Sequence, residues 1–267
     1  MPEILGIIAG NGAYPKELAA AARRSGVKTI IAAAFIGETD PALVQHVDAI
    51  EWLRVGQLSR LLKVLSDGKV RHAVMAGQIA PKNLFDLRPD WKALLLLAHL
   101  KERNAESIFA AIAAELGKAG VELLPATSFL EDQLAQAGLI AGSALSRREE
   151  NDLDFGWKIA KEIAQLNIGQ TVIVKNGTVL AVEGFDGTNE TILRGGRLAR
   201  KGAIMIKVAK SNQDMRFDVP VIGLETVRTA SEARVRVIAV EAARTLLLEQ
   251  DAIIEMASRS GISIFAR

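Results

Sequence analysis

A glycine-rich segment follows the first apolar run of the chain, and such a segment can bind phosphate through its backbone. The apolar run over 4–9 leads directly into this segment, and Pro15 then begins a helix. The N–H groups at the start of a helix carry partial positive charge, so they favour an anion. We predict a phosphate-binding turn, with a purely structural tight turn as the alternative. Its residues are Gly10, Asn11, Gly12 and Ala13.

A second turn of this kind, Gly77-Gln78-Ile79-Ala80-Pro81, follows the strand predicted over 70–76. Ligands of open α/β sheets bind at the carboxyl ends of the strands, so two such turns can line one crevice. We include Gly77 and Gln78 among the predicted substrate-binding residues. Two ordinary strand exits would have the same sequence.

Carboxylate, amide and hydroxyl groups are concentrated over 183–190. Glu183, Asp186, Thr188 and Asn189 follow a predicted strand, with glycines between them. Oxygen ligands of this kind suit Mg²⁺, which usually takes one or two carboxylates together with water and substrate phosphate. An acidic helix start would have the same composition, since Asp and Thr favour N-caps. Both interpretations stay open.

Seven cations and one acid, Asp214, lie between residues 194 and 216. A solvated helix face is the default explanation for the first four, which are Arg194, Arg197, Arg200 and Lys201. Lys207 and Lys210 differ, because they flank the end of an apolar strand predicted over 203–208. Cations at such a place can hold a polyphosphate.

Asp218 interrupts an apolar stretch and stands two residues before Pro220. Proline restricts the residue before it to extended conformations, so it limits how this carboxylate is presented. A carboxylate in apolar surroundings is either bonded to backbone in a turn or is a placed catalytic group.

The elements that must position these residues alternate between strand and helix in the first half. The pattern predicts strands over 3–9, 27–35, 49–55, 70–76 and 121–124, and helices over 16–25, 57–66, 91–101 and 106–118. Strands separated by helices of this length indicate a Rossmann-like, mostly parallel sheet covered on both faces. The four leucines at 94–97 cannot all face one side of a helix, and we favour burial of that helix over contact with lipid.

The second half mixes a hairpin with α/β units, which predicts an α/β domain with a mixed sheet. The hairpin joins strands over 171–175 and 178–183 through Asn176-Gly177, the strongest short hairpin signal. Helices are expected over 153–166, 190–200, 225–233 and 251–260, and extended segments over 203–208, 217–222, 236–240 and 262–265. We expect an N-terminal domain over 1–138, a linker over 139–148 and a catalytic domain over 149–267. An ordinary loop within one domain is the alternative to the linker.

Composition excludes several classes of protein. The 267 residues suffice for two domains, and 33 basic against 31 acidic residues leave a balance that does not suit nucleic-acid binding. The chain has no cysteine and only three scattered histidines, which excludes disulfides and disfavours a zinc site. The longest apolar runs are far shorter than a bilayer-spanning helix, and the N-terminus does not resemble a secretion signal. We expect a cytoplasmic protein with at most peripheral membrane contact.

Several blocks, taken in order, resemble one family, the LpxI-type UDP-2,3-diacylglucosamine pyrophosphatases of lipid A (lipopolysaccharide) synthesis. The resemblance runs from residue 4 to about residue 266. The blocks are GIIAGNGAYP at 6–15, DFG at 154–156, LNIGQ at 166–170, VLAVEG at 179–184, GTN at 187–189, KVAK at 207–210 and RFDVPVIG at 216–223.

The resemblance implies Mg²⁺-dependent hydrolysis of a lipid-linked UDP-sugar, in which water attacks the α-phosphorus to release UMP and 2,3-diacylglucosamine 1-phosphate (lipid X). It implies two domains, and it places the family's essential aspartate on Asp218. We therefore expect Asp218 to bind Mg²⁺ or to orient the water, with Glu183 and Asp186 as further metal-site groups. Lys207 and Lys210 would hold the diphosphate. An NAD(P)-dependent oxidoreductase and a non-catalytic nucleotide-sugar binding module are the alternatives, and Pro15 in place of a third glycine argues against the first.

Overall fold

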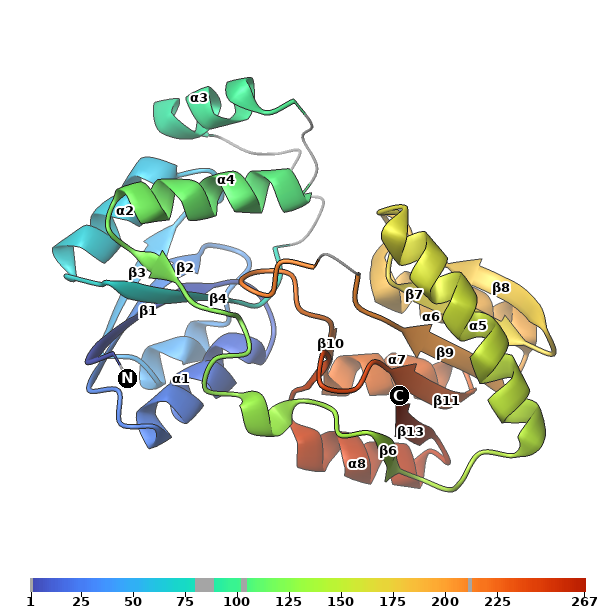
Figure 1. The fold of residues 1–267 in the computed structure, drawn as a ribbon. Coiled ribbons are helices and arrows are strands. Elements are labelled where there is room, and N and C mark those ends of the chain that lie inside the picture. Colours follow the sequence, from blue (N-terminus) through green and yellow to red (C-terminus); the bar gives the residue numbers. More distant parts are fainter. Residues whose placement is uncertain (1, 80–88, 102–104, 211–212) are drawn as a thin grey trace. The chain divides into compact units, whose positions relative to one another are not determined.

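Two large β-sheets organise the chain in the computed structural model, which describes residues 2–79, 89–101, 105–210 and 213–267 (Figure 1). The first unit comprises Met1–Glu131 together with Asp214–Asp218, and the second comprises Asp132–Gln213 and Val219–Arg267. Residues 214–218 thus belong to the first unit, although the chain on either side of them belongs to the second. Ala80 and Pro81 of the second predicted turn lie outside the described residues.

The sheet of the first unit is parallel throughout and has the strand order β3-β2-β1-β4-β5. Its strands are β1 (Ile4–Ala9), β2 (Thr29–Phe35), β3 (Ala49–Leu53), β4 (His72–Ala76) and β5 (Glu122–Leu123). The central strand β1 is almost fully buried, as expected for a continuous apolar run with a neighbour on each side. The chain builds the sheet outward from β1 first on one side and then on the other, so β1 and β4 flank a topological switch point.

Helices cover both faces of this sheet. They are α1 (Tyr14–Arg24), α2 (Leu58–Asp67), α3 (Trp91–His99) and α4 (Ala105–Lys118). Helix α1 lies on one face, whereas α2 and α4 lie on the other (Figure 1). Leu61 and Leu65 of α2 and Leu116 of α4 pack with the sheet side chains Ile8 and Met75 into one apolar core.

The sheet of the second unit is mixed, with the order β6-β13-β11-β9-β7-β8. Its strands are β6 (Gly138–Ala141), β7 (Thr171–Lys175), β8 (Thr178–Val182), β9 (Ala203–Lys207), β11 (Val235–Val240) and β13 (Ser263–Ala266). The pairs β9–β11 and β11–β13 are parallel, and the pairs toward both edges are antiparallel. A separate parallel pair joins β10 (Val221–Ile222) to β12 (Leu246–Leu247). The predicted fold class, a parallel sheet followed by a mixed one, is therefore confirmed.

Apolar cores form on both faces of the mixed sheet. The helices are α5 (Arg147–Gln165), α6 (Gly187–Ala199), α7 (Leu224–Glu232) and α8 (Gln250–Arg259). Leu153 and Ala160 of α5 belong to one core, whereas Ile192 of α6, Val227 of α7 and Ile253 of α8 belong to the other. None of the helices within the described ranges combines the length and the apolar character needed to cross a bilayer.

The predicted hairpin joins β7 to β8, and its turn residues adopt the conformation that the Asn-Gly signal requires. Asn176 and Gly177 have φ values of 53° and 67°, as in a type I′ turn. Both of their N–H groups donate to the carboxylate of Asp152, each at 2.7 Å. Asp152 is 6% exposed, so these two bonds satisfy a buried carboxylate and tie the turn to α5.

The segment predicted as a linker, 139–148, is regular structure of the second unit. It contains most of β6, which pairs antiparallel with β13, and the start of α5. Helix α5 begins at Arg147, earlier than predicted, because Ser146 and Glu149 form a capping box. Arg147 and Arg148, which the predicted linker included, are instead the first residues of this helix.

Two other predicted boundaries differ from the structure. The extended segment predicted over 217–222 is reduced to β10, and residues 215–217 form a turn. Helix α6 starts at Gly187 instead of residue 190, so the oxygen-rich segment supplies its first turn.

The capping box gives a first test of this fold. We expect Ser146→Ala to lower the free energy of unfolding by about 1 kcal/mol, because it leaves an N–H at the start of α5 without its acceptor. Urea unfolding followed by circular dichroism measures the change. Ser258→Ala, on the exposed face of α8, is the matched control and should cost nothing, since alanine has the better helix propensity. Equal losses in both variants would contradict the capping role.

Candidate active site

The two predicted glycine turns contact each other at the switch point of the parallel sheet. The N–H of Gly10 donates to the carbonyl of Ala76 at 2.7 Å, and that of Asn11 donates to the carbonyl of Gln78 at 2.7 Å. A Cβ at Gly10 would lie 2.5 Å from the Gln78 carbonyl oxygen, and one at Gly77 would lie 2.4 Å from that of Asn11. Both glycines are therefore required for the close approach of the turns.

The first turn also leads into an N-terminus of α1 that lacks a side-chain cap. Ala13 occupies the N-cap position, and its methyl side chain offers no acceptor to the N–H groups of the first turn. Gly12 has a φ of 91° with open space around it, and Asn11 is also exposed. The positive end of the dipole of α1 thus follows two exposed residues, which suits an anion.

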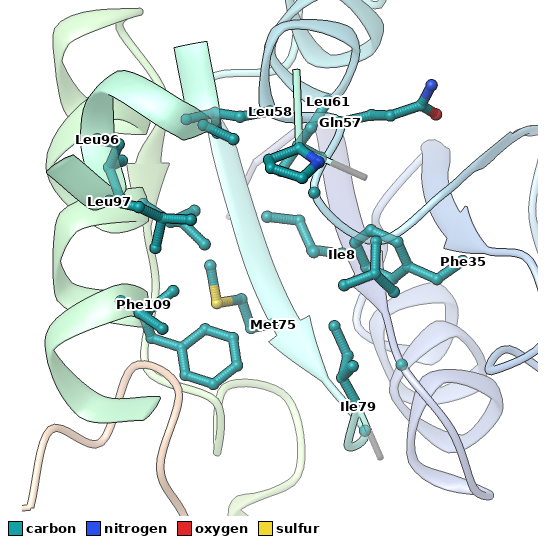
Figure 2. A pocket seen from close by; sticks show the side chains of 18 residues that line it. Ile8, Phe35, Gln57, Leu58, Leu61, Met75, Ile79, Leu96, Leu97 and Phe109 are labelled. Carbon is teal, nitrogen blue, oxygen red and sulfur yellow. The ribbon is translucent and has the colours of Figure 1, made fainter. Parts of the chain in front are cut away.

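An apolar pocket lies beside these turns in the first unit (Figure 2). Gly10 and Gly77 line it, together with Met75 of β4 and side chains of α2, α3 and α4. Gln57 is the polar side chain among its lining residues, and its amide points away from the apolar ones (Figure 2). Its Oε1 instead accepts the N–H of Arg54 at 2.8 Å.

Helix α3 forms part of this pocket and is not buried all round, which corrects the expectation for the four leucines at 94–97. Leu96 and Leu97 line the pocket, whereas Leu94 and Leu95 are 46% and 43% exposed. The apolar side of the helix that carries Leu96 and Leu97 therefore faces the pocket. The side that carries Leu94 and Leu95 faces outward.

Asp218 ends the short segment 214–218 of the first unit. Its N–H donates to the carbonyl of Asp214 at 3.0 Å, and the carbonyl of Met215 accepts the N–H of Ala126 at 2.7 Å. The ring of Phe217 lies 5.7 Å from that of Phe109, which lines the apolar pocket. The residue before Asp218 is therefore anchored at the pocket that Gly10 and Gly77 also line. Asp218 itself is half-buried.

An ion pair within this segment fixes its shape. The carboxylate of Asp214 accepts from Nη2 of Arg216 at 2.6 Å and from its Nε at 2.9 Å, and Oδ1 also accepts the N–H of Arg216. The hydrogen bond with Arg216 holds the pKa of the Asp214 carboxyl below its ordinary value. The sequence shows these two charges, but only the fold shows that they brace the turn before Asp218.

In the second unit, the register of the sheet brings Glu183 and Lys207 together where β8 and β9 end. Thr171 at the start of β7 pairs with Lys207 at the end of β9, and the Thr171 carbonyl accepts the N–H of Glu183. Because α6 starts soon after β8, Thr188 reaches the same place. Its hydroxyl donates to Oε1 of Glu183 at 2.6 Å and accepts from Nζ of Lys207 at 2.9 Å.

Lys207 is 7% exposed, so its charge needs a partner within the protein. Burial by itself would raise the pKa of the Glu183 carboxyl, but the Lys207 charge and the Thr188 hydroxyl outweigh it and hold that pKa below its ordinary value. The Gln170 N–H also donates to Oε2 of Glu183, at 3.1 Å. Both carboxylate oxygens thus accept hydrogen bonds within the unit.

The other predicted residues of this unit take different places. Asp186 accepts the Gly184 N–H at 3.0 Å and forms an ion pair with Arg194 at 3.2 Å. Asn189 is exposed on the first turn of α6. Lys210 follows β9, and its N–H donates to Oε1 of Gln213 at 2.8 Å.

A charged cluster that the sequence analysis missed holds the chain after Lys207. Oε2 of Glu241 accepts the N–H of Ala209 at 2.8 Å and pairs with Nζ of Lys161 at 2.9 Å. Arg244 donates to the carbonyl of Lys210 at 3.1 Å and lies 3.7 Å from Glu241. Lys161 and Glu241 are 80 residues apart, and no local pattern relates them.

The carboxylates do not assemble into a metal site among the described residues, where no group of three or more Asp, Glu or His side chains could hold an ion. Glu183 and Asp186 belong to the second unit. The Glu183 carboxylate accepts from Thr188 and a backbone N–H and faces the Lys207 charge, and the Asp186 carboxylate accepts a backbone N–H and pairs with Arg194. Asp218 belongs to the first unit. The predicted three-carboxylate set therefore does not fit a metal within either unit.

The Glu183 carboxylate predicts a pH effect on stability. Its folded pKa lies below the ordinary value of 4.5. The stability that it contributes is therefore present above pH 4.5 and is lost as the pH falls through the folded pKa. Glu183→Gln should destabilise the protein by about 1–3 kcal/mol at pH 7, because Lys207 stays buried without its counter-charge. The difference in the free energy of unfolding between this variant and the unsubstituted protein should become smaller below pH 4.5.

Urea unfolding over a pH series checks this, with Glu162→Gln on the exposed face of α5 as the control. If Glu183→Gln lowers the free energy of unfolding by the same amount at acid pH, the charge of the carboxylate does not cause the loss of stability.

Comparisons with known proteins cover both units. The LpxI N-terminal domain family matches residues 4–133, and the LpxI C-terminal domain family matches residues 136–265. A relative from Caulobacter vibrioides, the UDP-2,3-diacylglucosamine pyrophosphatase LpxI, is 28% identical over 271 residues, which cover 97% of this chain and 96% of the relative.

Among solved structures, a similar one is the biotin carboxylase domain of 2-oxoglutarate carboxylase from Hydrogenobacter thermophilus. It is 13% identical, with a TM-score of 0.28, over 73% of this chain and 41% of that one. A TM-score this low is not evidence of a shared fold. The two domain families, in contrast, match the chain in order and almost from end to end, and their boundary falls where the two units divide. The chain therefore belongs to the LpxI family.

Proposed function

We propose that this protein hydrolyses UDP-2,3-diacylglucosamine to UMP and 2,3-diacylglucosamine 1-phosphate, a step of lipid A biosynthesis. Membership of the LpxI family and the name of the Caulobacter relative support this substrate. In the reaction, the oxygen of water bonds to the α-phosphorus, and the bond from that phosphorus to the bridging oxygen breaks. The sugar 1-phosphate leaves with that oxygen.

One structural observation carries the proposal: Gly10 and Gly77 belong both to the turns at the switch point and to the lining of the apolar pocket. A substrate with a diphosphate and two acyl chains needs an anion site next to an apolar cavity. The first unit provides the two side by side.

The acyl chains would occupy this pocket. Its described side chains, Gln57 apart, are aliphatic, aromatic or thioether groups, and they come from β1, β2 and β4 as well as from three helices. Burying an alkyl chain there contributes about 0.8 kcal/mol per methylene. Leu96 and Leu97 of α3 form one wall, so this helix would contact the lipid directly.

The diphosphate would be held by backbone N–H groups and by lysine side chains. The N–H groups around Gly12 present a positive dipole end, and Lys207 and Lys210 supply positive charge. The Lys207 ammonium has three N–H donors, and Thr188 uses one of them. Glu183 and Thr188 fix the direction of this ammonium, so their role is positioning.

Asp218 would act at the reacting phosphorus. Its segment is braced by the Asp214–Arg216 pair and anchored through Phe217, so the carboxylate is held by a rigid turn. Two roles suit a carboxylate there: it accepts a proton from the attacking water, or it binds the cation that accompanies the diphosphate. Preorganised charge of this kind supplies most of the rate acceleration in phosphoryl transfer.

We propose Mg²⁺ as the cofactor, with Asp218 as its protein ligand. Mg²⁺ is commonly bound through one or two carboxylates together with substrate phosphate oxygens, so a site with a single carboxylate suits it. When bound, the ion would neutralise charge on the diphosphate. Glu183 and Asp186 are not needed as ligands, because their oxygens are engaged by other groups. Since the substrate carries two acyl chains, we also propose a cytoplasmic location with peripheral membrane contact.

Asp218→Asn keeps the shape of the side chain and removes its charge. We expect UMP release from UDP-2,3-diacylglucosamine to fall at least about 100-fold, with substrate binding and the thermal transition retained. Chelation of divalent cations should abolish activity of the unsubstituted enzyme, and added Mg²⁺ should restore it.

Asp251→Asn, on the exposed first turn of α8, is the matched control and should have normal activity. Near-normal UMP release by Asp218→Asn would exclude the proposed role of this carboxylate. Activity that persists in chelator would exclude the metal but leave the hydrolysis itself in place.

The apolar pocket can be tested on one helix. Leu97→Trp fills the pocket, so we expect the KM for a long-chain diacyl substrate to rise about tenfold, while a short-chain analogue is affected less. Leu95→Trp, on the exposed side of α3, is the control and should leave both substrates unaffected. Equal effects of the two variants on both substrates would show that the acyl chains bind elsewhere.

A further inference from the structure

The outer face of α6 combines leucines with arginines and remains unexplained by the proposed reaction. Leu193, Arg194, Arg197 and Leu198 recur at helical spacing and are all exposed. Leu193 and Leu198 are 37% and 62% exposed, so two large apolar side chains lie on this face. Arg200 and Lys201 continue the exposed surface beyond the end of the helix.

The packing of α6 explains why this face points outward. Gly195 and Gly196 occupy the inner side, where a Cβ would lie 2.5 Å from Cβ of Ile173 and 2.5 Å from Cβ of Ala233 respectively. The two glycines let the helix lie against β7 and the end of α7. Rotation of the helix would drive larger side chains into these contacts, so the leucines at 193 and 198 cannot turn inward.

A basic hollow adjoins the end of this helix. It has a volume of about 490 Å³, and four cationic side chains line it together with two serines and two glycines. The cations are Lys175, Lys201, Arg234 and Arg236. The hollow lies at the amino ends of β9, β11 and β13, whereas Lys207 lies at the carboxyl end of β9. The hollow and the Glu183–Lys207 pair therefore lie at opposite ends of β9.

Two of these cations serve the fold itself. Nζ of Lys175 donates to the carbonyls of Ala199 and Lys201, which caps the end of α6. Arg236 forms an ion pair with Glu149 and donates to the carbonyl of Gly261.

The remaining cations differ, because the described part of the chain shows no ion pair for Lys201 or Arg234. It also shows none for Arg197 on α6 or for Arg200 just beyond the helix. Four exposed positive charges thus lie around the end of one helix.

We propose that the outer face of α6 and the basic hollow together form the surface through which this protein binds an anionic lipid bilayer. The leucines at 193 and 198 would enter the headgroup region, and Arg197, Arg200, Lys201 and Arg234 would pair with lipid phosphates. Charge complementarity favours this occupant, since four or more clustered cations beside apolar side chains are typical of segments that bind acidic lipids. The hollow would accept a headgroup phosphate, with the Ser260 hydroxyl as a donor, since the Ser231 hydroxyl donates to Ser260.

If the protein binds a bilayer through this surface, the opposite end of β9, where Lys207 lies, remains uncovered. Binding of this kind is weak and reversible, because each cation contributes only modestly and salt screens it. Membrane binding through this surface is separate from catalysis, so the proposed hydrolysis would stand even if the protein did not bind vesicles.

The test is sedimentation of the full-length protein with vesicles of phosphatidylcholine, with and without phosphatidylglycerol. We expect binding only to the anionic vesicles and weaker binding as salt rises. Arg197→Gln combined with Lys201→Gln should weaken it about 25-fold, at about fivefold for each cation. Leu198→Ser should weaken it about tenfold.

Arg148→Gln combined with Lys158→Gln is the matched control, because it removes the same charge from exposed positions of α5. It should bind as the unsubstituted protein does. Equal losses in the two double variants would overturn the proposal, because net charge alone would then explain the binding. Failure of the unsubstituted protein to bind anionic vesicles would overturn it as well. UMP release from detergent-dispersed substrate should be the same in both double variants, which separates this result from a failure of the enzyme.

Discussion

The close backbone contact between the turns after β1 and β4 is the constraint on which the first unit depends. The strands are neighbours in a parallel sheet, and their exits meet so closely that a side chain at Gly10 or Gly77 would overlap a carbonyl oxygen of the other turn. The contact holds the uncapped start of α1 at the switch point, and it places both glycines on the wall of the apolar pocket. Glycine at these positions therefore serves packing first, and any approach of phosphate depends on that packing.

The second unit solves a different problem, which is how to bury a lysine at the end of a strand. Lys207 is almost fully buried, and Glu183 and Thr188 satisfy it from the neighbouring strand end and helix start. A buried ion pair adds little net stability, because desolvation offsets most of the attraction. Its value here is geometric: it fixes the ammonium in one direction, and the cluster around Glu241 fixes the chain that follows.

The segment 214–218 shows how long-range contacts can place a residue such as Asp218. Its sequence neighbours belong to the second unit, yet the Met215 carbonyl and the Phe217 ring bind Ala126 and Phe109 of the first. Asp218 is therefore held by the unit that contains the glycine turns and the apolar pocket.

The sequence by itself determined the class of both sheets, the hairpin at Asn176-Gly177 and the positions of the glycine turns, because these follow from local periodicity and backbone preference. It also carried the family resemblance, which depends on the order of motifs. Only the tertiary structure decided that Glu183 faces Lys207, that 139–148 is part of a sheet and a helix, and that the leucines at 94–97 divide between a pocket and the surface. Each of these depends on contacts between residues far apart in the chain, on which local spacing carries no information.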